Sequence, residues 1–369
     1  MSVESPIFIF PRFAKGEPEP SMLLERLNEY GRVFFDTNRP NTPIVLLGIS
    51  IDNWEAIDIS QFDFLRIHRI SKPTNNFLYF SLKSFLLMRN LGYKPRILIS
   101  GDIFFGFLSA FLIKKIWLRL STPIQISIHG YYLETLVFKR FIPPFLLKHY
   151  ILVVYHLADS IRVVSDQLRL NLIDKYGITS SKIFVAPIPV RLQKVSQSTL
   201  RKIEVLFVGR FHIERGIDTL TNICRELSTF NSSEKIVLVG DGPLRFATEQ
   251  KLKSYKNIIF KGFVSPSVLA GLMQDSKILL STAPLEGYGL AVREALASGC
   301  IVVARRNEVT KDLNTDFPNS IFLFETESEA LEIIAHHLSK RINYSETRRF
   351  RAKLEMSNAQ ALQSLIASW

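Results

Sequence analysis

The sequence has few of the features that mark secreted, metal-binding or membrane-spanning proteins. Only two cysteines occur among 369 residues, and Cys224 and Cys300 lie far apart in apolar contexts. This excludes a disulfide framework and a CxxC zinc or redox site, and it fits a reducing cytosol. The longest uncharged apolar run, residues 103–113, is well short of the ~20 residues that a membrane-spanning helix needs. The N-terminus lacks the basic region and apolar core of a signal peptide, so no export is expected.

Several catalytic motifs are also absent. The sequence contains no GxxxxGK[ST] loop, no HExxH, no GxSxG elbow and no DxD pair. The run "VGDGPLR" contains a GxG, but Arg245 stands where a dinucleotide fingerprint needs its third glycine, which argues against hydride transfer. Without a DxD pair we expect no metal ion at a diphosphate, and no cofactor. Arginine side chains then remain as the groups that could neutralise the charge of a diphosphate.

Acidic residues are scarce in one long segment. Residues 64–150 contain 13 Lys and Arg against 2 acids, which accounts for most of the net charge of +12. Phenylalanine, leucine and isoleucine are interleaved with these cations, and such a face suits an anionic membrane surface. A solvated basic face over a buried core is the alternative. No nucleic-acid-binding motif accompanies the charge, so no nucleic acid partner is expected.

Short apolar runs alternate with helical patterns along the chain, which predicts an α/β fold with doubly wound parallel sheets. Prolines and polar residues interrupt the pattern at residues 186–202, so two domains in tandem are expected. Strands are predicted at 7–10, 44–50, 97–100, 124–129, 160–165, 183–187, 203–209, 235–240, 258–264, 277–283, 300–304 and 320–324. The predicted domains are an acceptor-binding one at 1–190, a nucleotide-sugar-binding one at 191–345 and a C-terminal helix at 346–369 that packs back on the first.

The turn after the predicted strand 203–209 carries two arginines. Gly209 ends the strand, Arg210 follows it, and Arg215 precedes the glycine that opens the next helix. Open sheets bind ligands at the carboxyl ends of their strands, and a helix N-terminus attracts anions. Two guanidinium groups on this loop therefore suit a diphosphate. Two unrelated surface arginines are the plainer interpretation.

The stretch "APLEGYGLAVREALASG" carries two carboxylates around a predicted helix start. If residues 287–290 bend the chain into a helix, their N–H groups can bind a phosphate or a sugar hydroxyl. Glu286 precedes this turn and Glu294 follows it, on the order of 10 Å away by helical rise. That separation suits two parts of one extended ligand, such as a nucleotide-sugar. A capping glutamate and a solvated glutamate are the alternative.

These motifs resemble the retaining glycosyltransferases of the GT-B fold, of the family-four type known as glycosyl transferases group 1. "VGRFHIERGID" is similar to the family's diphosphate loop, "VGDGP" to its next turn, "KGFVSPSVLAG" to its base-binding strand and helix, and "EGYGLAVREALASG" to its Glu-x7-Glu signature. "ISIHG" resembles its strand-ending histidine. The resemblance implies two Rossmann-like domains facing across a cleft. It also implies metal-independent transfer with retained anomeric configuration.

The resemblance also implies roles for single residues. Arg210 and Arg215 would stabilise the leaving diphosphate, Glu286 and His129 would hold the transferred sugar, and Glu294 would bind the ribose. A structural role for His129 is the alternative. The residues expected to bind the donor are Gly209, Gly242, Phe263, Val264, Gly287, Tyr288, Gly289, Leu290 and Glu294.

Some positions depart from the family pattern. Arg215 replaces the usual lysine, which keeps the charge and changes the hydrogen-bond geometry. "FAKGEPEPS" stands in place of an N-terminal Gly-Gly loop, which leaves Lys15 and Gly16 as weak candidates for acceptor contacts.

The sequence thus predicts a cytoplasmic hexosyltransferase, peripheral on the inner face of the membrane. It would use a nucleoside-diphosphate sugar and a glycan or lipid-linked acceptor in polysaccharide or glycolipid synthesis. A nucleotide-sugar-binding pseudoenzyme or an epimerase on the GT-B fold is the alternative.

Overall fold

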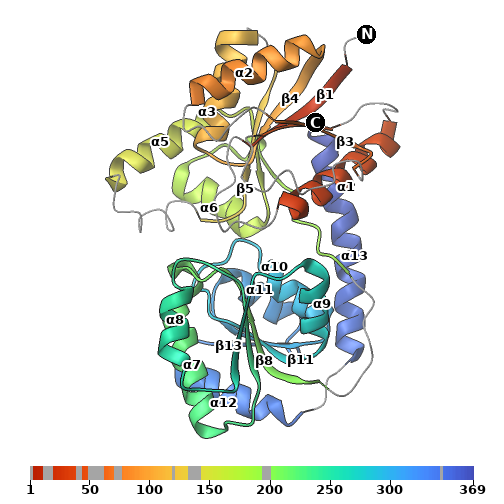
Figure 1. The fold of residues 1–369 in the computed structure, drawn as a ribbon. Coiled ribbons are helices and arrows are strands. Elements are labelled where there is room, and N and C mark those ends of the chain that lie inside the picture. The colour runs from red at the N-terminus through yellow and green to blue at the C-terminus, as the bar shows by residue number, and fades with distance from the viewer. Residues whose placement is uncertain are drawn as a thin grey trace. The chain divides into compact units, whose positions relative to one another are not determined.

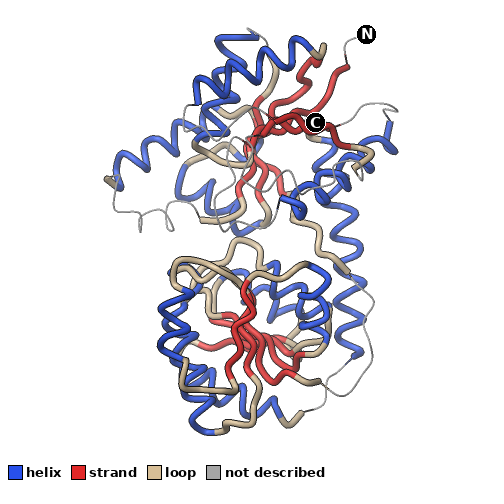
Figure 2. The backbone as a smooth tube through the Cα atoms, viewed as in Figure 1, coloured by secondary structure: helices blue, strands red, loops and turns tan. Residues whose placement is uncertain are grey.

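Two compact α/β units make up the chain, and each has helices on both sides of a parallel sheet (Figure 2). Unit 1 comprises Met1–Pro187 and Ala359–Trp369, and unit 2 comprises Ile188–Asn358. None of the helices in the described part of the chain is long and apolar enough to cross a bilayer. The computed structural model describes residues 3–10, 20–38, 44–48, 62–69, 77–118, 121–131, 143–192, 201–340 and 344–369.

The sheet of unit 1 has seven parallel strands in the order β3-β2-β1-β4-β5-β6-β7. Ile7 of β1 pairs with Val45 of β2 on one side and Leu98 of β4 on the other, and all three are fully buried. The strand order reverses between β1 and β4, as in a doubly wound fold. The strands are β1 (Val3–Phe10), β2 (Ile44–Gly48), β3 (Leu65–Arg69), β4 (Tyr93–Ser100), β5 (Ile124–Ile128), β6 (Ser160–Val163) and β7 (Ile183–Val185).

Helices cover both faces of this sheet. Because parallel crossovers are right-handed, the reversal of strand order places α1 on one face and α2, α3, α5 and α6 on the other, as Figure 1 shows. The helices are α1 (Pro20–Asn38), α2 (Phe77–Asn90), α3 (Phe105–Leu112), the π-helical turn η3 (Ile113–Leu118), α5 (Pro144–Leu157), α6 (Asp166–Tyr176) and the 3₁₀ turn η4 (Ser180–Lys182).

The last helix, α13 (Tyr344–Ala367), is shared by the two units. Its residues up to Asn358 belong to unit 2 and the rest to unit 1. Trp369 follows it and is only 5% exposed, because its ring packs edge-on against Phe8 at 5.5 Å and Tyr30 at 6.2 Å. The end of the chain therefore completes the core on the α1 face of unit 1.

The sheet of unit 2 has six parallel strands in the order β10-β9-β8-β11-β12-β13. All six were predicted from the sequence to within two residues at each end. The order again reverses, here between the neighbours β8 and β11. The strands are β8 (Ile203–Val208), β9 (Ile236–Val239), β10 (Ile258–Gly262), β11 (Ser276–Ser281), β12 (Ile301–Arg305) and β13 (Ile321–Phe324).

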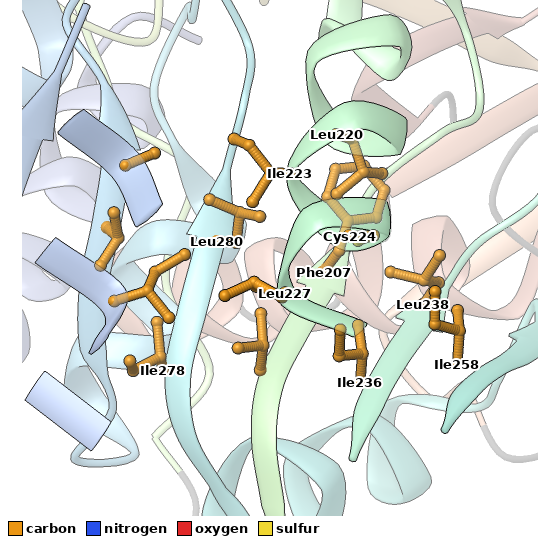
Figure 3. Packing of buried hydrophobic residues seen from close by; sticks show 14 of the residues in the cluster. Phe207, Leu220, Ile223, Cys224, Leu227, Ile236, Leu238, Ile258, Ile278 and Leu280 are labelled. Carbon is orange, nitrogen blue, oxygen red and sulfur yellow. The ribbon is translucent and has the colours of Figure 1, made fainter. Parts of the chain in front are cut away.

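One hydrophobic core of unit 2 lies between this sheet and α7, with α12 beside it. Leu220, Ile223, Cys224 and Leu227 recur at helical spacing and face the strands (Figure 3). Burying each large apolar side chain contributes ~1.5–3 kcal/mol. The helices are the 3₁₀ turn η5 (Ile213–Arg215), α7 (Ile217–Phe230), α8 (Arg245–Leu252), α9 (Pro266–Gln274), α10 (Leu290–Ala297), α11 (Glu308–Asp316) and α12 (Glu327–Leu338).

Strand β3 and helix α11 were among the elements that were not predicted. Strand β3, "LRIHR", lies at the sheet edge and mixes apolar with basic residues, so it lacks the continuous apolar run of a buried strand. Helix α11, "EVTKDLNTD", buries only three side chains, and its start is set by a capping box between Asn307 and Thr310.

Candidate functional site

The reversal of strand order in unit 2 marks where an open sheet binds ligands. Strands β8 and β11 are neighbours there, and both run toward the same edge. The loop after β8 contains Arg210 and Arg215, and the loop after β11 contains Glu286. The two loops predicted to carry the chemistry are therefore adjacent.

Gly216 allows these two loops to touch. It adopts a left-handed conformation, with φ of 64°, between η5 and the start of α7. A Cβ atom at this position would overlap the carbonyl oxygen of Thr282 in the β11 loop. The Thr282 hydroxyl also donates a hydrogen bond of 2.7 Å to the carbonyl of Arg215. Only glycine permits this approach. Thr282 was not predicted as a site residue.

Arg215 and Glu286 form an ion pair across the two loops. Nη1 of Arg215 donates to Oε2 of Glu286 at 2.6 Å, and the two side chains are 34% and 13% exposed. Nε of Arg215 is buried without a hydrogen-bond partner among the described residues. Because the Arg215 side chain is still 34% exposed, a ligand can reach this guanidinium group with a further acceptor.

Arg210, the second predicted arginine, pairs within its own loop. Its side chain is exposed and donates to Glu214, which also lies 3.7 Å from His212. Burial acts to raise the pKa of Glu214, but the hydrogen bond from Arg210 and the charges of Arg210, His212 and Arg215 outweigh it, so the pKa is lowered. Sequence reasoning missed Glu214, although a carboxylate four residues after an arginine signals such a pair.

The turn after β9 packs tightly against the β8 loop. The Phe211 amide donates to the carbonyl of Asp241 at 2.8 Å, and the Leu244 amide donates to the carbonyl of Phe211 at 3.0 Å. A Cβ atom on Gly240 would overlap the Gly209 carbonyl, and one on Gly242 would lie 2.6 Å from that of Phe211. The glycines of "GDG" thus fix the shape of the arginine loop.

Helix α10 begins at Leu290, directly after the predicted turn. Gly289 adopts a left-handed conformation with φ of 72° as its N-cap, and Gly287, Tyr288 and Gly289 are all buried. The first N–H groups of such a helix have no partner within it, so they suit an anion or a hydroxyl. The guanidinium group of Arg293 lies 4.2 Å from the centre of the Tyr288 ring and donates to its carbonyl at 3.0 Å.

The other predicted donor residues occupy the same unit. Glu294 lies in the middle of α10 and is half-buried. Phe263 is exposed and Val264 half-buried in the short loop after β10, which precedes α9. This loop follows the strand next to β9, and the Gly240 amide donates to the carbonyl of Gly262 at 2.8 Å.

Asn307 was also missed, and it links the loops after β11 and β12. Its side-chain amide donates to the carbonyl of Ala283 at 3.1 Å while its oxygen caps α11. An asparagine directly after a strand and before a helix signals such a cap in the sequence.

The remaining predicted residues do not belong to unit 2. His129 follows β5 in unit 1 and is exposed. Desolvation, followed by the charges of Arg162 and Arg26, lowers the pKa of His129. Its imidazole is therefore neutral at pH 7. Lys15 and Gly16 lie outside the described residues.

A cavity of about 650 Å³ lies elsewhere in unit 2. It is lined by Cys300, Ser320, His337 and Glu346, and others, at the amino ends of β12 and β13 and beside α13. Because this edge of the sheet is opposite the one that carries Arg215 and Glu286, we assign the cavity no part in donor binding.

The sequence of unit 2 is similar to known glycosyltransferases. Residues 191–351 match the family described as glycosyl transferases group 1. A GDP-mannose-dependent alpha-(1-6)-phosphatidylinositol dimannoside mannosyltransferase from Mycobacterium tuberculosis is 32% identical over 130 residues, 34% of each chain. A 2-deoxystreptamine N-acetyl-D-glucosaminyltransferase from Niallia circulans is 26% identical over 125 residues, 33% of this chain and 32% of that one. These matches thus span about one third of the relatives' length.

The fold of the whole chain is also similar to solved structures. TarM from S. aureus, solved with fondaparinux, alpha-GlcNAc-glycerol and UDP, has a TM-score of 0.72 at 12% identity and covers 100% of this chain and 99% of its own. Both units therefore have the Rossmann-like topology of GT-B glycosyltransferases. Residues 191–351 are thus similar to the glycosyl transferases group 1 family.

Proposed function

We propose that this protein transfers a sugar from a nucleoside-diphosphate sugar to a glycan or lipid-linked acceptor. In this proposal the anomeric configuration is retained and no metal ion takes part. The observation that supports it most is the Arg215–Glu286 pair, which joins a cation for the diphosphate to a carboxylate for the sugar hydroxyls at the switch point of the sheet.

The two arginines account for the chemistry at the diphosphate. As the bond between the sugar's anomeric carbon and the diphosphate oxygen breaks, negative charge grows on the leaving group. Arg215 offers its partly exposed guanidinium group, and Arg210 lies at the start of the same loop with an exposed side chain. Preorganised donors of this kind each contribute about 10²–10³ in rate. Fixed positive charge on the loop takes the place of a divalent cation.

The remaining donor residues hold the sugar and the nucleoside. Glu286 accepts hydrogen bonds from sugar hydroxyls, with the N–H groups at Tyr288, Gly289 and Leu290 beside it at the start of α10. Glu294, further along α10, accepts from the ribose hydroxyls. The backbone and side chains of Phe263 and Val264 contact the base. His129 orients the transferred sugar.

The acceptor is the less constrained half of the proposal. The Mycobacterium relative acts on a phosphatidylinositol dimannoside, and the S. aureus structure holds a glycerol-linked sugar. Both names fit a lipid-linked or glycan acceptor in glycolipid or cell-surface polysaccharide synthesis. Peripheral association with the cytoplasmic face of a membrane belongs to the same proposal.

Donor binding and turnover test this function. Isothermal titration with UDP, GDP and ADP should show one nucleotide bound clearly more tightly than the other two. With the matching labelled nucleotide-sugars, we expect slow release of the free sugar, unchanged by EDTA, with NMR showing the anomer of the donor as first product. Binding without any release would indicate a pseudoenzyme, and interconversion of two sugar nucleotides would indicate an epimerase. Either result would contradict the proposal.

A further inference from the structure

Three helices of unit 1 present apolar side chains to solvent on one face of the sheet. Helix α2 packs against α3 and η3, and α5 is tied to the start of α3. The Tyr150 hydroxyl donates to the Ile103 carbonyl at 2.7 Å, and the rings of Tyr150 and Phe104 stack at 5.3 Å. Figure 1 shows α2, α3 and α5 on the side of the sheet away from α1. The outer surfaces of α2, η3 and α5 are called the basic apolar face below.

Helix α5 is apolar on its outer side as well as its inner side. Its inner residues Leu147, Ile151 and Val154 are buried in unit 1. Leu146, Val153 and Leu157 recur at spacings of seven and four residues, so they share the opposite, solvent-facing side. They are exposed, Val153 by 54%, and Phe145 in the first turn by 64%. A helix that serves only to cover a core has a polar outer side.

The neighbouring helices continue this composition. Leu78 and Leu86 of α2 and Ile116 of η3 are exposed. Across the described residues, more than half of the exposed large apolar side chains lie between Leu78 and Leu157. Scattered exposed apolar residues are normal, but a concentration on adjacent helices marks an interaction surface.

The charge of this face has a single sign. The sequences of α2, η3 and α5 contain no Asp or Glu. Lys83, Arg89, Lys115 and Lys148 are exposed on them, whereas Lys114 is neutralised by Asp159 at 2.7 Å. The next helix, α6, contains Asp166 and Asp174 as well as basic residues. The run of helices without acidic residues therefore ends with α5.

We propose that the basic apolar face docks this protein on an anionic lipid bilayer, with the α5 residues Phe145, Leu146, Val153 and Leu157 entering the interface. Apolar side chains among lysines, without acids, have the chemistry of an interfacial helix. The lysines attract anionic headgroups while the apolar residues are buried at the boundary of the acyl chains. Base-stacking or phosphate-tracking surfaces of nucleic-acid-binding proteins are not this apolar. This docking rests on the proposed function, because it brings the enzyme to the membrane that holds a lipid-linked acceptor.

Vesicle co-sedimentation of the full chain tests this proposal. The wild-type protein should pellet with phosphatidylcholine vesicles containing 30 mol% phosphatidylglycerol, used as a probe, and bind pure phosphatidylcholine at least tenfold more weakly. Raising the salt concentration should weaken binding, because exposed charges are screened. L146E/V153E, which places two carboxylates on the outer side of α5, should reduce binding to the anionic vesicles at least tenfold.

The matched control is Phe230→Glu at the end of α7, where a still more exposed apolar residue, at 79%, lies in unit 2. It should bind the vesicles like the wild type. Nucleotide titration separates this proposal from the enzymatic one, because L146E/V153E should bind the preferred nucleotide unchanged. Vesicle binding that is unaffected by L146E/V153E, or a wild type that binds neither vesicle, would overturn the proposal. The proposal would also be overturned if the wild type formed a concentration-dependent dimer, had no affinity for vesicles, and lost the dimer in L146E/V153E.

Discussion

Arg215 and Glu286 are separated by 71 residues in the sequence, and their side chains meet at 2.6 Å. Each follows a different strand, and these two strands are neighbours where the strand order of unit 2 reverses. The pair neutralises one face of the guanidinium group and leaves Nε without a partner in the described chain. In the proposed function, this pairing holds the guanidinium group in place for the diphosphate.

Replacing Arg215 should therefore impair the reaction more than binding of the free nucleoside. We expect Arg215→Ala to lower kcat/KM for donor hydrolysis by about 10²–10³, the loss of a preorganised donor. Arg215→Lys should retain part of the rate, because it keeps the charge and loses the planar fork. Arg225→Ala on the outer surface of α7 is the control and should stay within twofold. Activity of Arg215→Ala within twofold of wild type would exclude the proposed role.

Gly216 and Gly177 offer a matched pair for the close approach of the two loops. Both adopt φ near 65°, but a Cβ atom at Gly177 meets nothing within 4 Å, whereas one at Gly216 overlaps Thr282. Gly177→Ala should cost about 1 kcal/mol for the left-handed conformation alone. Gly216→Ala should cost clearly more in denaturant unfolding and should also weaken nucleotide binding. Equal costs for the two variants, with binding intact, would show that the loops do not depend on this contact.

Glu214 should make the stability of unit 2 depend on pH in the acid range. Its pKa in the folded protein lies below the ordinary value of 4.5. Its stabilising contribution is therefore complete above the unfolded pKa and is lost as the pH falls through the folded pKa. Glu214→Gln should be less stable than wild type at pH 7, and the difference should vanish at low pH. A difference that stays constant from pH 7 to pH 3 would contradict this.

Trp369 should contribute strongly to the stability of unit 1. Its ring is buried between Phe8, Tyr30 and Phe34, and its carbonyl accepts from Arg96. Trp369→Ala should lower the free energy of unfolding by about 3–5 kcal/mol, as for other large side chains removed from a core. Met356→Ala, at an exposed position of α13, is the control and should have little effect. Similar losses in both variants would place the tryptophan outside the core.

The turns of the site could be predicted because their backbone conformations require glycine. Gly216, Gly240, Gly242 and Gly289 adopt positive φ, and three of them sit where a Cβ atom would crowd a neighbouring backbone. Apolar runs likewise predicted the strands of unit 2, since buried parallel strands are nearly all apolar. Such features are local, and the sequence records them directly.

Features that depend on side chains distant in sequence could not be predicted. The sequence predicted Arg215 for the diphosphate and Glu286 for the sugar, but nothing local indicates that the two pair with each other. Nothing in the sequence distinguishes Thr282 from other threonines, because its contact with Gly216 is made only in the folded chain. Strand β3 has too few apolar residues to predict, because it lies at the sheet edge, where it pairs with one strand alone, β2.

The shared helix α13 limits how this chain can be dissected. A gene fragment that ends near Pro187 encodes every strand of unit 1 but omits Ala359–Trp369, which the same unit buries. Such a fragment would expose the apolar groove left by Leu365 and Trp369 and would aggregate. Adding the missing eleven-residue peptide in trans would then restore solubility, much as a detached segment complements a split reporter.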